Sequence, residues 1–170
     1  MNVAVVGGGL VFSFEGAEKE LLVMALLETQ EDYSVSYDRL PEPLQKFWAG
    51  TLSDDPALAE AADDLKEARL AWRSDRAQAL EQWLNPDGPL AGPDPLFMLE
   101  AEEVDLFLAI LNDRRLTLAA YHGFGEGEME VDLEEISAKE VQRAVWEIHF
   151  LALVMEHCLE ALREDEAGDE

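Results

Sequence analysis

The chain has 170 residues, the length of one domain, and its 48% hydrophobic and 29% charged residues are typical of a globular protein. Its 38 acidic and 12 basic residues leave a net charge of −26, which repels nucleic-acid backbones and anionic membrane surfaces. We therefore expect no nucleic acid and no membrane among its partners.

Residues 1–14 predict a β-hairpin, because two β-branched and aromatic runs flank three glycines that can adopt the positive φ of a tight turn. The glycines resemble the start of a dinucleotide-binding fingerprint, but Phe12 stands where its third glycine would be. A strand pattern follows them, whereas phosphate binding needs a helix N-terminus. The segment also lacks the basic start and apolar helix of a signal peptide, so we expect a cytoplasmic protein.

Helical patterns dominate the rest of the chain. Residues 18–27 form an apolar helix-forming segment, and residues 43–48 predict a short helix after a proline-rich break. A longer helix begins with Asp55 as its N-cap and Pro56 at its first position, and ends at Asn85. The prolines and glycines that follow predict a stiff connection rather than a linker between domains.

Two further helices are predicted. The first begins at Leu96 or Ala101 and ends at Tyr121, just before a glycine-rich segment. The second begins at the capping box formed by Ser137 and Glu140 and ends at residue 163. The sequence therefore predicts a mainly α fold, a helical bundle of about four helices with a small N-terminal β-hairpin.

The expected domain organisation is simple. Residues 1–163 form a single helical domain, and residues 164–170 form an acidic, disordered tail with no apolar side chains to bury.

Four of the 12 basic residues share one stripe of the predicted long helix, next to its core-facing side; this basic stripe consists of Lys66, Arg69, Arg73 and Arg76. One interpretation is a cationic groove for an anionic ligand. The other is that these side chains lay their stems on the core and pair with carboxylates of neighbouring helices. The net charge of −26 opposes anion capture and favours the second interpretation.

Asn112, Asp113 and Arg115 form a polar cluster within an otherwise apolar helix. On a helical wheel Arg115 shares a face with leucines, so its guanidinium needs a buried partner, for which Glu147 is a candidate. The cluster can be a ligand site, or it can hold one helix against another. Buried polar groups more often have the second role.

The last helix has two apolar stripes on opposite sides, and the second consists of Trp146, Phe150, Leu153 and His157. Such a helix is either central to the fold or exposed at an interface. If the hairpin and the short helix leave it uncovered, this second stripe is the candidate surface for a protein partner or for homo-oligomer formation.

No catalytic or cofactor motif is found, and we expect no catalytic residue, no cofactor and no metal site. Glu-x-x-His pairs, a nucleophile elbow, a P-loop, zinc spacing and a calcium loop are all missing from the sequence. Cys158 is the single cysteine, which fits a reducing compartment and a packed core thiol. The acidic residues of segment 123–135 are interpreted as a solvated loop.

The order of features resembles a poorly characterised bacterial family of small acidic helical proteins. The shared features are a hairpin before an apolar helix, a charged middle, the motif L-N-D-x-R-L at residues 111–116, an acidic loop and an aliphatic last helix. The resemblance implies that Asn112, Asp113 and Arg115 are the polar positions of this chain that match the motif of the family. Members are often encoded near the adaptor of the Clp protease, which implies a role around protein turnover.

The leading hypothesis is a non-enzymatic cytoplasmic protein that acts through protein–protein contacts. Two alternatives stay open. One is a small-molecule or cation-binding enzyme with its polar site at Asn112, Asp113 and Arg115. The other is an acidic mimic of nucleic-acid charge, whose acids would line up on one face with phosphate-like spacing.

Overall fold

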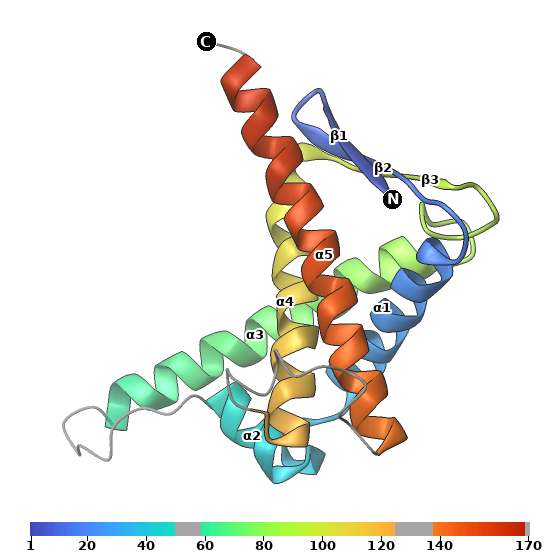
Figure 1. Ribbon diagram of the computed structural model, residues 1–170. Coiled ribbons are helices and arrows are strands. Elements are labelled where there is room, and N and C mark those ends of the chain that lie inside the picture. The colour runs from blue at the N-terminus through green and yellow to red at the C-terminus, as the bar shows by residue number, and fades with distance from the viewer. Residues whose placement is uncertain (50–58, 125–137, 169–170) are drawn as a thin grey trace.

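The computed structural model describes residues 1–49, 59–124 and 138–168 (Figure 1). Within them lie five α-helices and three strands, so the predictions of a mainly helical fold and of an N-terminal hairpin are confirmed, whereas a bundle of about four helices is not. In chain order the elements are β1 (Asn2–Val6), β2 (Gly9–Ser13), α1 (Glu18–Ser34), the 3-10 turn η1 (Tyr37–Arg39), α2 (Glu42–Ala49), α3 (Ala59–Leu84), β3 (Leu96–Leu99), η3 (Ala101–Glu103), α4 (Val104–His122) and α5 (Lys139–Gly168).

The three strands form one antiparallel sheet in the order β1-β2-β3. Gly7 and Gly8 connect β1 to β2 with φ of 61° and 83°, and a two-residue hairpin turn with positive φ at both central positions favours glycine. The turn matches the right-handed twist of the two strands that it joins. The glycine run is thus explained by turn geometry.

The prediction that a helix begins at Leu96 is wrong, because residues 96–99 form β3 against β2. Phe97 and Leu99 are buried while Leu96 and Met98 are exposed, which is the alternation of a half-buried strand. A four-residue apolar run does not distinguish a strand from a helix by its pattern alone. The alternative start at Ala101 is closer to the structure, since η3 begins there and α4 follows it.

Aromatic rings beneath the sheet form one end of the core. The Phe107 ring of α4 lies 5.5 Å from that of Phe12, 5.8 Å from that of Phe97 and 5.8 Å from that of Trp83, measured between centroids. The indole nitrogen of Trp83 donates a hydrogen bond of 2.9 Å to a carboxylate oxygen of Glu103, so its polar atom is satisfied at the core's edge. Phe107 therefore joins the sheet to α3 and α4.

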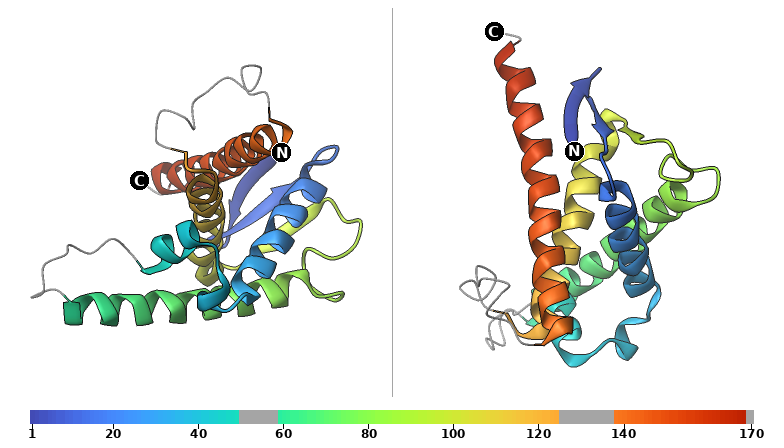
Figure 2. Two further views of the ribbon diagram at one scale, coloured as in Figure 1. Left: turned by 90° about the horizontal axis from the view of Figure 1, so that it is seen from below. Right: turned by 45° about the vertical axis from the view of Figure 1, so that its right-hand side comes forward.

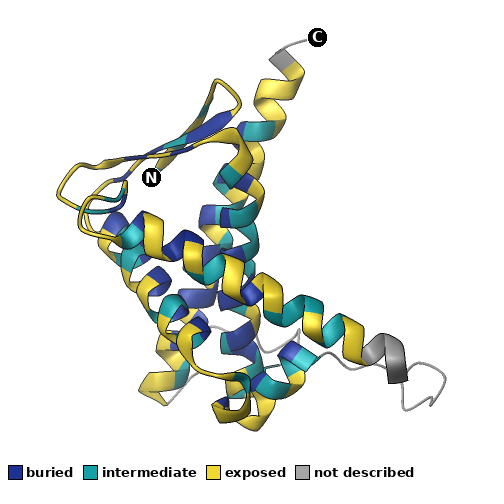
Figure 3. Cartoon of the chain, turned by 180° about the vertical axis from the view of Figure 1, so that it is seen from behind, coloured by how far each residue is buried: buried dark blue, intermediate teal, exposed yellow. Residues whose placement is uncertain are grey.

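The helices pack around this core in a layered arrangement. α4 and α5 lie side by side and run in opposite directions, while α1 packs against α3, and α2 contacts both α3 and α4 (Figure 1). β1 lies against α5. Figure 2 shows that α3 extends past the other helices at its N-terminal end, and among the described residues of α3 none before Arg73 is buried (Figure 3). Cys158 of α5 is fully buried, which raises the pKa of its thiol to about 12 and confirms the interpretation as a core thiol.

Two helices are longer than expected. α1 continues from the predicted segment to Ser34, and α5 continues to Gly168 instead of ending at residue 163. The expectation of a disordered tail over residues 164–170 is therefore wrong for residues 164–168, which are helical. A helix that is already nucleated and packed adds residues at little cost, and glutamate and alanine are good helix formers.

Several predicted start signals lie outside the described residues, namely Asp55, Pro56 and Ser137. The same holds for the acidic segment 123–135 apart from its first two residues, and the glycine-rich segment begins as expected with Gly123, which ends α4 at a φ of 71°. Across the part of the chain that the structure describes, no helix combines the length and the apolar character that a membrane span needs.

The close approach of Gly9 to β3 gives a testable prediction. A Cβ atom at Gly9 would collide with the carbonyl oxygen of Leu99, whereas one at Gly7 would meet open space. We expect Gly9→Ala to lower the free energy of unfolding by about 1–3 kcal/mol because the backbone of β3 must shift. Gly7→Asn, which asparagine tolerates at positive φ, is the control and changes it by less than about 1 kcal/mol. Urea unfolding followed by circular dichroism measures both; equal losses would contradict the role of Gly9.

Candidate functional site

The structure does not bring the predicted polar cluster together around one point. Asp113 is buried, accepts a hydrogen bond of 2.7 Å from the Tyr33 hydroxyl and forms an ion pair with Arg76. Arg115 points to another side of α4, where its Nη1 lies 3.8 Å from the sulfur of Met155. Residues two apart on a helix point about 200° apart, so Asp113 and Arg115 cannot act on one ligand. Asn112, the third member, is half-buried.

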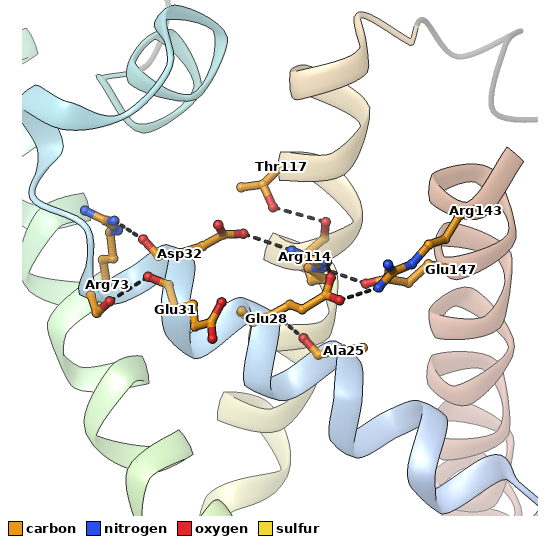
Figure 4. Close-up of polar contacts among 11 residues, drawn as sticks. Ala25, Glu28, Glu31, Asp32, Arg73, Arg114, Thr117, Arg143 and Glu147 are labelled. Carbon is orange, nitrogen blue, oxygen red and sulfur yellow. Dashed lines mark hydrogen bonds and ion pairs between the residues drawn. The ribbon is translucent and has the colours of Figure 1, made fainter. Parts of the chain in front are cut away.

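The buried ion pair that the helical wheel predicted for Arg115 is formed by its neighbour Arg114. Its Nε donates to Glu147 of α5 at 2.7 Å, its Nη1 to Asp32 of α1 at 2.9 Å, and its Nη2 to Glu28 of α1 (Figure 4). The expected pair of Arg115 with Glu147 is thus wrong by one residue. The Nε of Arg115 is buried with no hydrogen-bond partner among the described residues.

A sequence signal for Arg114 exists, but it is ambiguous. Arg114 follows Phe107 by seven residues and Ile110 by four, which is the spacing of one buried face. Arg115 has the same spacing from Leu108 and Leu111. The rotation of α4 against its neighbours decides between the two, and that rotation follows from tertiary packing.

The contacts of Arg114 extend into a network across four helices, which we call the Arg114 cluster (Figure 4). Glu28 also pairs with Arg143 of α5, and the backbone carbonyl of Asp32 accepts a hydrogen bond from Arg73 of α3. The Thr117 hydroxyl donates to the Arg114 carbonyl at 3.1 Å. The network therefore ties α1, α3, α4 and α5 to one another.

The charges in this cluster are matched. Burial alone would lower the pKa of Arg114, but the hydrogen bond from Arg114 to Glu147 and the negative charges of Glu147, Asp32 and Glu28 raise it above its ordinary value. Burial raises the pKa of Asp32, and the charge of Arg114 offsets this only in part. All three guanidinium nitrogens of Arg114 already donate to carboxylates, which fits a structural role.

A cleft of about 380 Å³ opens beside the cluster between α1, α4 and α5. Its charged lining mixes both signs, because Arg114 and Arg143 face the carboxylates of Glu28, Glu140 and Glu147. Glu28 and Glu147 are committed to arginines, so the cleft offers little uncompensated charge to an ion.

The basic stripe lies against other parts of the chain. Its members reach carbonyls, rings and a carboxylate of the α1–α2 region and α4; among the described residues, Arg76 is the member that pairs with a carboxylate of a neighbouring helix. Lys66 lies 4.3 Å from the ring centroid of Tyr37, Arg69 donates to the Phe47 carbonyl at 3.3 Å, Arg73 donates to the carbonyls of Val35 at 2.6 Å and of Asp32, and Arg76 pairs with Asp113. These contacts fasten the α1–α2 connection to α3.

The second apolar stripe of α5 is only partly covered. Trp146 is 40% exposed and Leu153 48% exposed, while Phe150 and His157 are half-buried. The rings of Trp146 and Phe150 stack with centroids 5.5 Å apart and planes 2° from parallel. In the described part of the chain, neither the hairpin nor α2 covers Trp146 and Leu153.

Comparison with protein families matches residues 3–162 to the model described as Domain of unknown function (DUF2017). The match spans most of the chain, so the chain belongs to this family. No curated protein and no solved structure matches it. The expectation of an uncharacterised family is confirmed at this level, and the function is argued below from the geometry.

Neighbouring arginines of α4 allow a matched test of the cluster. Arg114→Met leaves the carboxylate of Glu147 buried without its charge partner, and we expect the free energy of unfolding to fall by about 3 kcal/mol or more. Glu28 and Asp32 are partly exposed and add little to this loss, since water screens them.

Arg115→Met is the control and should change the free energy of unfolding by less than about 1 kcal/mol, because Arg115 contacts a thioether and no carboxylate among the described residues. The double change Arg114→Met with Glu147→Met should recover part of the loss, since it removes both buried charges. Denaturant unfolding measures all three variants, and equal losses for Arg114→Met and Arg115→Met would contradict the assignment.

A pH dependence follows from Asp113. Burial raises the pKa of its carboxyl, and the contacts with Tyr33 and Arg76 lower it only in part. The folded protein therefore binds this proton more tightly than the unfolded chain, so the contribution of Asp113 to the free energy of unfolding decreases as pH rises above about 4 and is constant once the folded carboxyl has ionised.

Asp113→Asn removes this titration. The free energy of unfolding of the wild type minus that of the variant should fall as pH rises above about 4 and should level off once the folded carboxyl has ionised. Thermal and urea unfolding at a series of pH values measure it. The exposed Glu42→Gln is the contrasting variant, because Lys46 lowers the pKa of Glu42 and its difference should rise with pH. A difference for Asp113→Asn that rises with pH would show that the pairing with Arg76 outweighs burial.

Proposed function

We propose that this member of the DUF2017 family acts in the cytoplasm, without catalysis, by binding a partner protein through the outer face of α5. This face is defined by Trp146, Phe150 and Leu153. The observation that carries the proposal is the exposure of Trp146 and Leu153, at 40% and 48%, on a helix whose other side is core. Large apolar side chains grouped on a rigid helix are typical anchors of protein interfaces.

The chemistry of the partner follows from the residues next to this face. Glu156, Glu160 and Glu164 are exposed and follow Leu153 at three, seven and eleven residues, so they continue the same side of α5. A partner that meets the whole side needs apolar side chains followed by lysines or arginines. The net charge of −26 speeds the encounter with such a basic partner and disfavours acidic ones.

The setting around protein turnover, which the family resemblance implies, is part of this proposal and depends on the identity of the partner. The enzyme alternative finds no support in the geometry, because Asp113 and Arg115 point to different sides of α4. The alternative of an acidic mimic shares the basic partner but needs no apolar anchor. Substitutions of apolar and of acidic residues therefore separate these two.

A photo-crosslinking amino acid at Leu153 identifies the partner in cells, with the same group at the exposed Trp72 of α3 as the control. We expect position 153 alone to capture a partner, at a segment with apolar residues flanked by lysine or arginine. Capture of an acidic segment, capture of a second copy of this chain, or equal capture at both positions would contradict the proposal.

Binding of the captured partner to purified variants then tests the face. Trp146→Ser and Leu153→Ser should each weaken binding at least about tenfold, because each removes an apolar anchor. Trp72→Ser, which removes an indole that is at least as exposed as that of Trp146, should leave binding unchanged. Glu156→Lys with Glu160→Lys should slow association and weaken its dependence on salt. If only the glutamate changes matter, the acidic mimic replaces this proposal.

A further inference from the structure

A cavity of about 350 Å³ lies between the first half of α1 and the proline-rich connection before β3. Its volume is within the range of small-molecule sites. Much of its wall is apolar, formed by Val23, Leu27, Leu84, Leu90, Pro93 and Pro95. The proline-rich connection is therefore also one wall of a cavity.

The same cavity contains a buried cation. Lys19 is only 8% exposed, and its ammonium donates hydrogen bonds to the backbone carbonyls of Gly92 at 3.1 Å and Asp94 at 2.5 Å. An ammonium has three donors, so one is left over. Among the described residues no carboxylate forms an ion pair with Lys19, although the chain has 38 acidic residues and Arg114 alone binds three carboxylates.

A buried charge without a counter-charge is costly, and this cost favours an anion that enters the cavity. The first turn of α1 adds little to this positive potential, because Glu18 and Glu20 lie in it and the Glu18 N–H already donates to the Glu15 carbonyl. Glu20 is the one acidic side chain that lines the cavity, and it is exposed. Exposed acids more than about 8 Å from the ammonium are largely screened at physiological salt.

We propose that this cavity binds a small monocarboxylate that carries an apolar chain. The carboxylate accepts the remaining hydrogen bond of Lys19, and the chain lies against the apolar wall formed by α1, Leu84 and the proline-rich connection. The site is separate from the outer face of α5, so it adds a ligand to the partner proposed above. It also differs from the basic stripe, whose members lie on α3 and do not line this cavity.

Calorimetry on the full chain with octanoate, octanol and acetate as probes, at about 150 mM salt, tests the ligand class. We expect octanoate to bind, octanol to bind at least about tenfold more weakly because it lacks the charge, and acetate to show no binding because it lacks the chain. Octanol binding as tightly as octanoate, or no octanoate binding up to about 10 mM, would overturn the proposal.

Variants then assign the site. Lys19→Met should weaken octanoate at least about tenfold and leave octanol unchanged, whereas the exposed Lys46→Met should alter neither. Glu20→Gln should tighten octanoate by removing a like charge. Val23→Phe fills the cavity while keeping Lys19, so it should abolish binding of both octanoate and octanol. This variant replaces Lys19→Met as the test if Lys19→Met fails to fold. Octanoate binding that survives Val23→Phe would place the ligand elsewhere and overturn the assignment.

Discussion

The arrangement of the helices depends on the burial of one positive charge. The side chain of Arg114 is only 7% exposed, so its guanidinium charge is buried. A buried charge is tolerated only where opposite charges surround it. Its carboxylate partners come from α1 and α5, so these two helices must stand at fixed positions on either side of α4. A buried ion cluster contributes little net stability over apolar packing, but any rearrangement that separates it is costly. The cluster therefore selects one packing of the helices.

α4 carries both kinds of core contact on one face. Phe107 joins the sheet and α3 through edge-to-face ring contacts, and Arg114 lies two helical turns further along on the same side. At Phe107, α4 can shift slightly because ring packing has no strict direction. At Arg114, the hydrogen bonds to carboxylates fix the position and rotation of α4. With α4 held at both ends, α5 turns one side to it and leaves Trp146 and Leu153 on the other.

The sequence predicted what depends on local signals and missed what depends on neighbours. The hairpin turn was predictable because consecutive glycines between two strand patterns favour a tight turn with positive φ. The end of α3 was predictable because Pro86 follows it. Which of Arg114 and Arg115 is buried was not predictable, since both have apolar residues at helical spacing. Only the rotation of α4 against its neighbours decides which one points into the core. β3 was missed for the same reason, because four apolar residues become a strand only when β2 offers its edge.

The distribution of the few cations explains how a chain of net charge −26 can still form specific contacts. Arg73, Arg76 and Arg114 are committed to carbonyls and carboxylates inside the fold, so they neutralise buried groups and not the surface. The outer surface is correspondingly more acidic than the composition alone indicates, which selects basic partners at a distance. Lys19 differs from Arg76 and Arg114, because its ammonium is held by backbone carbonyls that carry only partial charge. It therefore keeps a positive potential at the cavity, whereas the charges of Arg76 and Arg114 are neutralised by carboxylates.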